Sequence, residues 1–234
     1  MKKIFVAVLG IWMLLSTIAV ALVGLNNSVH RATIIMALGL IIFWNILGGS
    51  IMYHFRNKIR YFVQKINIKW QVKFVLFATF LFLIEEAITT AMTNLAPAFG
   101  VKLGEAYITA SANYFDVIFF HSVIVIAPMF IGWAIILSYF DFKPFTVFLL
   151  FGITGTLAEW SFSGLSSLGA FAIWIFVYGL MVYLPAYCCV PQTRVVHKAR
   201  WWLYPLAVFF PALFIPLTGW IPSLFDANHP KIDF

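Results

Sequence analysis

Residues 74–94, FVLFATFLFLIEEAITTAMTN, decide the fold class and limit where chemistry can occur. Most of the stretch is apolar, and it has about the length that an α-helix needs to cross a membrane. Glu85 and Glu86 nevertheless stand side by side within it. A charged group at the centre of a spanning helix costs about 2.5 to 3.5 kcal/mol, so such residues usually serve a function or belong to a buried pair.

The composition of the whole chain predicts an integral membrane protein. Of its 234 residues, 63% are hydrophobic and 10% are charged, and the mean hydropathy is +0.98. A soluble domain carries roughly 25% charged residues. Nine Trp and nine Tyr fit a polytopic helical protein, whose aromatic rings settle at the level of the lipid headgroups. We therefore expect an all-α fold, a single transmembrane bundle over residues 1–234 that crosses the cell membrane several times.

Seven segments are long and apolar enough to span a membrane. They cover residues 4–24, 32–54, 74–95, 117–139, 145–163, 169–190 and 201–221. The first segment, with MKK before it and AVA at residues 19–21, is also similar to a cleaved secretory signal. We favour an uncleaved helix because the apolar run exceeds a signal's usual 7 to 15 residues. Cleavage would leave six helices.

The distribution of basic residues predicts the orientation of the bundle. With the N-terminus inside and the C-terminus outside, 12 of the 15 basic residues lie on the inner side. These are Lys2, Lys3, Arg56, Lys58, Arg60, Lys65, Lys69, Lys73, Lys143, Arg194, Lys198 and Arg200. The outer side keeps Arg31, Lys102 and Lys231. The net charge of +7 is thus a topology signal with some attraction to anionic membrane lipid, and nucleic acid is not an expected partner.

The connecting segments leave several alternatives open. Residues 56–73 form either an interfacial helix or a solvated loop, and residues 96–117 form either a short surface helix or a re-entrant cap. Pro205, Pro211, Pro216 and Pro222 predict a kinked or broken last helix, because each lacks a backbone donor. The only cysteines, Cys188 and Cys189, are adjacent. We expect them to pack as small apolar residues rather than to accept a lipid.

Four ionisable residues inside the apolar segments stand out: Glu85, Glu86, His121 and Glu159. On helical spacing, Glu86 shares a face with Thr89, Thr90 and Thr93. A second polar face comprises Gly152, Gly155, Thr156, Glu159 and Ser163, and His121 shares a third with Pro128 and Gly132. We expect these faces to converge on a cavity in the outer half of the bilayer, with Asn113 and Asp116 near its entrance.

This set of side chains has three chemical interpretations. A glutamate paired with a histidine can activate water, because one group takes the proton while the other polarises the target. A buried glutamate can also carry a proton, or serve only as a protonated, hydrogen-bonded strut between helices. A metal held by Glu85 or Glu86, His121 and Glu159 stays open, since His and carboxylates both bind Zn²⁺. The sequence therefore leaves the cofactor unknown.

The glutamate pair followed by a histidine on the next helix resembles the CAAX protease and bacteriocin-processing family of glutamate intramembrane proteases, and the related PrsW-type proteases. Those families show EExxxR or EExxxK, then FxxxH or FxxxE, then a histidine with Asn or Asp four residues later. This chain has Thr90 in place of Arg or Lys, and Val117 in place of Phe. Glu159 is the only substitute for the later histidine. The resemblance covers roughly residues 74–160, rests on three residues and implies an intramembrane hydrolase.

The leading hypothesis is thus a hydrolase of a membrane-embedded peptide or lipid-like substrate. Glu86 would activate water, His121 would stabilise the oxyanion, and Glu159 would orient one of them. A proton-coupled transporter, in which Glu86 or Glu159 titrates, is the alternative from another class. A structural or partner-binding membrane protein is the third. A rhodopsin-like protein is excluded, because residues 201–222 contain no lysine for a Schiff base. Seven-helix hydrolases resembling ceramidases are excluded as well, because they need several membrane histidines and only one of the four candidate residues, His121, is a histidine.

Overall fold

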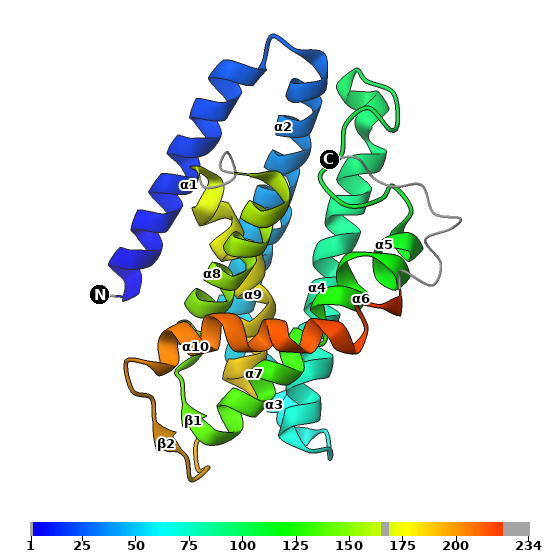
Figure 1. Ribbon diagram of the computed structural model, residues 1–234. Helices are drawn as coiled ribbons and strands as arrows, with labels where there is room; N and C mark the ends of the chain where they lie inside the picture. The colour runs from blue at the N-terminus through cyan, green and yellow to red at the C-terminus, as the bar shows by residue number, and fades with distance from the viewer. Residues whose placement is uncertain (1, 165–168, 222–234) are drawn as a thin grey trace.

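The computed structural model describes residues 2–164 and 169–221, and most of them are helical (Figure 1). The helices in the first half are α1 (Lys2–Gly24), α2 (Ser28–Leu40), the π-helix η1 (Ile41–Gly48), α3 (Gly49–Lys65), α4 (Trp70–Asn94) and the 3-10 helix η2 (Ala96–Phe99). Those in the second half are α5 (Tyr114–Phe120), α6 (Ser122–Ile126), α7 (Met129–Tyr139), α8 (Pro144–Ser163), α9 (Phe171–Cys189), α10 (Leu203–Phe209) and the 3-10 helix η4 (Phe210–Leu217). Two short strands, β1 (Phe140–Asp141) and β2 (His197–Lys198), pair in parallel.

The expected all-α membrane architecture is confirmed. In the described part of the chain, five helical segments are long and apolar enough to cross a membrane. They are Lys3–Gly24, Ser28–Lys65, Trp70–Asn94, Tyr114–Tyr139 and Phe171–Cys189. In addition, α8 is a 20-residue apolar helix that packs along α9.

The second spanning segment is longer than the sequence predicts. Helices α2, η1 and α3 join into one helical run of 38 residues, Ser28–Lys65. Much of the basic stretch 56–73 therefore continues this helix instead of forming a separate interfacial helix or a loop. The run passes through the eight-residue π-helix η1, a geometry that is frequent at functional sites.

The last apolar segment is broken, as its prolines predict. Its α-helical part ends at Phe209, and the 3-10 helix that follows contains Pro211 and Pro216. The run Leu203–Leu217 is shorter than the five spanning segments. It lies across the bundle (orange to red in Figure 1), with α10 against α8 and η4 against α7. Pro222, Lys231 and the C-terminus lie beyond the described residues.

The fourth apolar segment is not one continuous helix. The backbone leaves helical geometry at His121, with φ −130° and ψ −112°, so α5 ends and α6 begins there. A second break precedes α7 at Pro128, which lacks a backbone donor. The segment 117–139, expected as a single helix, is thus three short helices.

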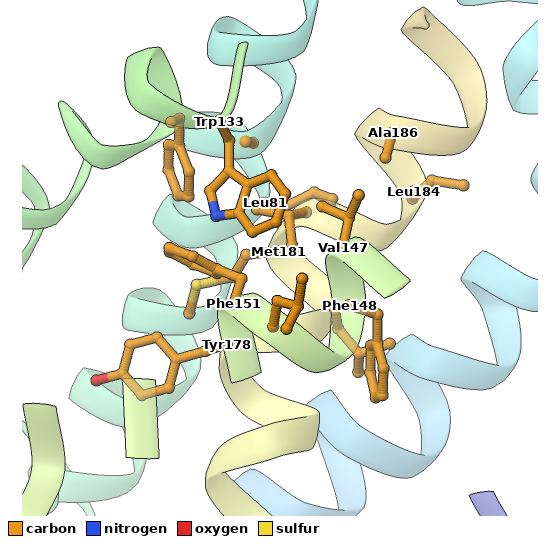
Figure 2. Packing of buried hydrophobic residues seen from close by; sticks show 14 of the residues in the cluster. Leu81, Trp133, Val147, Phe148, Phe151, Tyr178, Met181, Leu184 and Ala186 are labelled. Carbon is orange, nitrogen blue, oxygen red and sulfur yellow. The ribbon is translucent and has the colours of Figure 1, made fainter. Parts of the chain in front are cut away.

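The core lies where α4, α7, α8 and α9 meet. Figure 2 shows Trp133, Phe151 and Met181 packed together there, and all three side chains are at most 1% exposed. Helices α8 and α9 approach closely at Gly152, because glycine has no side chain. A Cβ atom there would lie 2.7 Å from the backbone oxygen of Ile175. Both cysteines are buried and free, which confirms their expected packing role.

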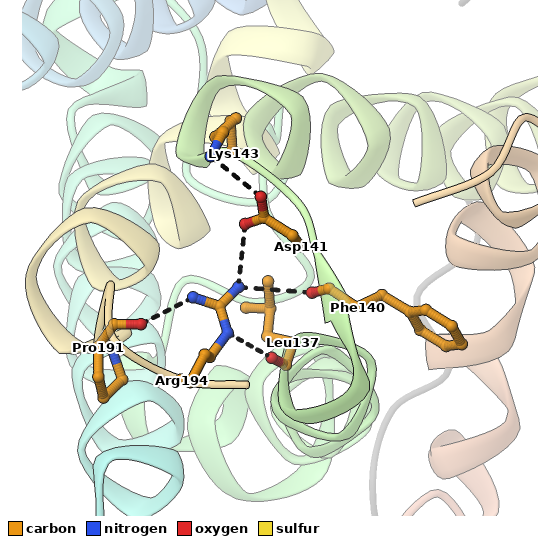
Figure 3. Close-up of polar contacts among 6 residues, drawn as sticks. All are labelled: Leu137, Phe140, Asp141, Lys143, Pro191 and Arg194. Carbon is orange, nitrogen blue, oxygen red and sulfur yellow. Dashed lines mark hydrogen bonds and ion pairs between the residues drawn. The ribbon is translucent and has the colours of Figure 1, made fainter. Parts of the chain in front are cut away.

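Arg194 connects α7, β1 and the chain that follows α9, at the end of the molecule that carries β1 and β2 (Figure 3). Its guanidinium donates hydrogen bonds to the carbonyls of Leu137, Pro191 and Phe140 at 3.0, 2.9 and 3.4 Å. It also lies 3.5 Å from Asp141, which forms a second ion pair with Lys143 at 3.0 Å. Partial burial lowers the pKa of Arg194, and the Asp141 carboxylate opposes this shift.

Candidate functional site

Helix α4 buries both adjacent glutamates: Glu85 is 5% exposed and Glu86 is 6% exposed. Glu86 lies 16 residues after Trp70 and eight before Asn94, or about 24 Å and 12 Å along the helix axis. The site therefore lies in the C-terminal half of α4, within the length that crosses the membrane.

Three hydroxyl groups from different parts of the chain meet the Glu86 carboxyl group. Thr89 Oγ1 donates to Glu86 Oε2 at 3.0 Å, and Thr109 Oγ1 donates to the same oxygen at 2.9 Å. The hydroxyl of Ser122, the first residue of α6, also interacts with Glu86. Glu86 is thus held by its own helix, by the segment after α4 and by the helix break at His121.

The segment that supplies Thr109 begins with the short 3-10 helix η2 and then folds back over the end of α4. We call residues 95–113 the cap segment. Asn94 Nδ2 donates to the carbonyl of Ala112 at 2.7 Å, and Thr93 Oγ1 accepts from the backbone N–H of Ile108 at 3.4 Å. The return needs a left-handed turn at Gly100, where φ is +88°.

Glu159 on α8 lies within electrostatic range of the two glutamates on α4. The Tyr178 hydroxyl on α9 donates to Glu159 Oε1 at 2.5 Å. Figure 2 shows this hydroxyl pointing away from the apolar side chains among which the Tyr178 ring packs. Glu85 interacts electrostatically with both Glu86 and Glu159, and Glu159 also interacts with Glu86. We call Glu85, Glu86 and Glu159 the carboxyl cluster.

No basic side chain neutralises the carboxyl cluster within the described ranges. The two ion pairs found there both involve Asp141, at the opposite end of α8 from Glu159. Like charges held close together and away from water disfavour each other's ionisation. The cluster is therefore suited to holding at least one proton.

The other predicted polar residues lie near the carboxyl cluster. His121 is half-buried at the break between α5 and α6, next to Ser122, whose hydroxyl interacts with Glu86. Asn113 caps α5 by accepting from the backbone N–H of Phe115 at 3.0 Å. Asp116 accepts from Ser111 Oγ at 3.3 Å.

A metal site does not follow from this geometry. Residues 2–164 and 169–221 contain no group of three His, Cys, Asp or Glu side chains that could hold a metal ion. The buried hydroxyl of Thr90, one turn after Glu86, makes no hydrogen bond to the described protein and is available to a ligand.

Three residues of this site do not follow from the sequence pattern: Tyr178, Thr109 and Ser122. Tyr178 stands in an apolar, aromatic helix, where only the general need of a buried tyrosine hydroxyl for a partner could have indicated it. Thr109 and Ser122 depend on the cap segment and the helix break. No protein-family model, curated protein or solved structure matches the chain.

Proposed function

We propose that this multi-pass membrane protein binds and releases protons at Glu85, Glu86 and Glu159, and that it couples proton movement to the transport of a solute. The observation that carries the proposal is the carboxyl cluster itself. It joins three buried or half-buried glutamates from two helices, without a basic partner in the described chain. Carboxylic acids inside a membrane protein typically serve as proton relays or line substrate pathways.

The hydrogen bonds of the cluster suit a group that changes its charge. Hydroxyl donors from Thr89 and Thr109 stabilise an ionised Glu86, whereas the nearby carboxyl groups favour a protonated one. Each of the two charge states of Glu86 therefore has a favourable contact at this site. Loss of a proton from Glu86 would strengthen its bonds to the cap segment, and uptake would weaken them.

The helix breaks give the proposed transporter its moving parts. Non-helical backbone within a membrane is tolerated where it is buried in protein or lines a water-filled cavity. His121 provides such a break directly before Ser122, which interacts with Glu86. The 3-10 helix η4 contacts α6 and α7, so movement of α6 would reach the crossing C-terminal segment.

The orientation that we propose has the N-terminus inside and the cluster in the outer half of the bilayer. The cell membrane is the proposed location, and membrane lipid is the expected surrounding partner. This orientation follows from the 12 basic residues assigned to the inner side against three on the outer side.

An intramembrane hydrolase is the second candidate function. The observation in its favour is that the His121–Ser122 break lies beside Glu86, so a histidine, a hydroxyl and a carboxyl group occur in one region. In this alternative Glu86 activates water, His121 stabilises the oxyanion and Glu159 positions one of them. The substrate would be a membrane-embedded peptide or a lipid-like molecule, as the resemblance to glutamate intramembrane proteases implies.

The test is proton uptake by the purified protein between pH 5 and 9. Glu86→Gln and Glu159→Gln preserve shape and most hydrogen-bonding capacity but cannot exchange a proton. We expect each variant to take up about one proton fewer per molecule than the wild type if its carboxyl group titrates in this range. Glu105→Gln, on the exposed part of the cap segment, is the matched control for a carboxyl group outside the carboxyl cluster.

Coinciding curves for the wild type and both cluster variants, together with unchanged melting temperatures, would contradict the proposed role in either function. The glutamates would then be structural, hydrogen-bonded struts. A lost titration supports proton binding by the cluster, which both candidate functions require. Loss of hydrolysis in His121→Asn, with proton uptake intact, would favour the hydrolase.

A further inference from the structure

A second site lies at the end of the molecule that carries β1 and β2, away from the carboxyl cluster. It is a cavity of about 1460 Å³. Its walls come from the start of α1, from η1 and α3, from the start of α8, from the end of α9 and from the chain that leads to β2. Small-molecule sites commonly measure about 300 to 1,000 Å³. The cavity is therefore large enough for a polar headgroup and part of an apolar chain.

The charged groups of this cavity are mainly basic. Its lining contains Lys3, Arg56, Lys143, Arg194 and Lys198 against the single acid Asp141, which leaves a formal charge of +4 with His54 neutral. Asp141 is already paired with Lys143 and Arg194 (Figure 3). Lys3, Arg56 and Lys198 form no ion pair within the part of the chain that the structure describes. These three cations are available to an anionic ligand.

Aromatic rings hold Arg56 in place at the cavity. Its guanidinium carbon lies 4.0 Å from the centre of the Tyr53 ring and 5.6 Å from that of Tyr187. Tyr53 and Tyr187 also take hydrogen bonds from this guanidinium, whose remaining N–H donors can bind a phosphate. Arg56 is thus oriented before any ligand arrives.

The wall of the cavity beyond these cations is apolar. Phe145 and Phe148 of α8 lie there with Phe176 and Leu180 of α9. The rings of Phe145 and Phe148 stack with their centres 5.9 Å apart. A small inorganic anion would need no such wall, whereas an acyl chain would bury its surface against it.

Asn45 supplies an independent indication that the cavity takes a ligand. Its side chain is 7% exposed and lines the cavity, and its Oδ1 atom has no hydrogen-bond partner. Its Nδ2 atom makes only a weak contact to Met13 Sδ at 3.7 Å. A buried carbonyl oxygen without a donor has lost its water without gaining a protein partner. Asn45 also belongs to the π-helix η1, and π-helical turns often mark functional sites.

We infer that this cavity binds an anionic amphiphile with a phosphate headgroup and an apolar chain. Arg56, Lys3 and Lys198 contact the phosphate, and the chain lies along Phe145, Phe148 and Phe176. Asn45 Oδ1 accepts a hydrogen bond from a hydroxyl or amide group of the ligand. This inference is independent of the proposed proton site, since the two sites share no residue.

Titration calorimetry of the full-length protein in a neutral detergent tests this inference. The probes are dioctanoylphosphatidylglycerol, which has a phosphate and hydroxyl groups, dioctanoylphosphatidylcholine, which has no net charge, and inorganic phosphate. We expect the phosphatidylglycerol to bind at least tenfold more tightly than either of the others. Its affinity should fall as salt concentration rises, because screening weakens contacts between exposed charges.

Variants of the cavity assign the binding to this site. Arg56→Gln with Lys198→Gln should weaken phosphatidylglycerol binding at least tenfold, and Asn45→Leu should weaken it several-fold. Lys58→Gln is the matched control, because Lys58 lies on the same helix as Arg56 but does not line the cavity. Lys198→Gln alone, at an exposed position, serves if the double variant does not fold, and it too should weaken binding.

Three results would overturn the inference. Equal binding of the two lipids would show that the charge is not recognised. Inorganic phosphate that binds as tightly as the lipid would identify a soluble phosphate compound as the ligand and remove the role of the apolar wall. Cavity variants that bind phosphatidylglycerol as the wild type does would place the lipid elsewhere on the protein.

Discussion

Tyr178 connects the apolar core to the carboxyl cluster. Its ring lies edge-on to Phe151, with ring centres 6.3 Å apart, while its hydroxyl donates to Glu159. A tyrosine can combine the two contacts because its body is apolar and only its tip is polar. A change in the packing of α9 would therefore reach Glu159 through one rigid side chain.

Tyr178→Phe should keep the packing and remove only the hydrogen bond to Glu159. We expect it to lower the free energy of unfolding by about 0.5 to 1.5 kcal/mol and to change the proton-uptake curve. Unfolding in detergent and the pH titration measure the two effects. Tyr139→Phe, at an exposed side chain, should leave both unchanged. If Tyr178→Phe also leaves both unchanged, the bond does not contribute to the site.

The sequence predicts the acidic members of the site but not their partners. Glu85, Glu86 and Glu159 can be recognised because carboxyl groups are costly inside a membrane and must find polar surroundings. Tyr178 carries no such cost in an aromatic helix. Ser122 and Thr109 come into contact with Glu86 only through a helix break and a returning loop. Their positions depend on tertiary contacts that periodicity does not encode.

Helices α8 and α9 are held close by glycines on both helices. A Cβ atom at Gly155 would lie 2.1 Å from the Tyr178 ring, and one at Gly179 would lie 2.7 Å from the backbone oxygen of Phe148. Such small residues let two membrane helices come so close that the backbone of one contacts the side chains of the other. The spacing between α8 and α9 in turn fixes the position of Glu159 relative to Tyr178.

Gly155→Ala should force these two helices apart. We expect a loss of about 1 to 3 kcal/mol of stability from overpacking, and an altered proton-uptake curve because Tyr178 must move. Gly10→Ala in α1 is the matched control, since a Cβ atom there meets nothing within 4 Å. It should be neutral or stabilise by up to about 1 kcal/mol. Melting temperatures in detergent give the comparison, and equal losses for the two variants would contradict the close packing.

The lengths of the helices could be predicted better than their interruptions. The expected spans 4–24, 74–95 and 169–190 agree within a few residues with α1, α4 and α9, because apolar length is a local property. Prolines likewise indicated the break after Phe209. No residue type at His121 predicts the end of α5, and η1 has an ordinary apolar sequence.

At the scale of the molecule, the two candidate sites lie toward opposite ends of the bundle. The carboxyl cluster lies in the later halves of α4 and α8, whereas the basic cavity is lined by the starts of α1 and α8 and by the end of α9. With the proposed orientation, the basic cavity faces the inner leaflet. Its cations then agree with the general excess of Lys and Arg on the inner side.

This orientation predicts which positions a membrane-impermeant maleimide reaches in intact cells. Cysteine at position 102, in the cap segment, should be labelled from outside, and cysteine at position 65, at the end of α3, should not. Each introduced cysteine is placed in a parent protein that carries Cys188→Ala and Cys189→Ala, which removes the two native thiols. Both native thiols are buried. Labelling at position 65 and protection at position 102 would reverse the topology.

The helical run Ser28–Lys65 is too long to lie wholly within the hydrocarbon core of a membrane. Its 38 residues extend for about 57 Å, nearly twice the roughly 30 Å of a bilayer's hydrocarbon core. Even a steep tilt of about 40° leaves about 44 Å along the membrane normal. Part of this helix must therefore stand in water or among headgroups in bilayers of any ordinary thickness. Spin labels placed along it would locate both membrane boundaries, and so provide a depth scale for every other helix.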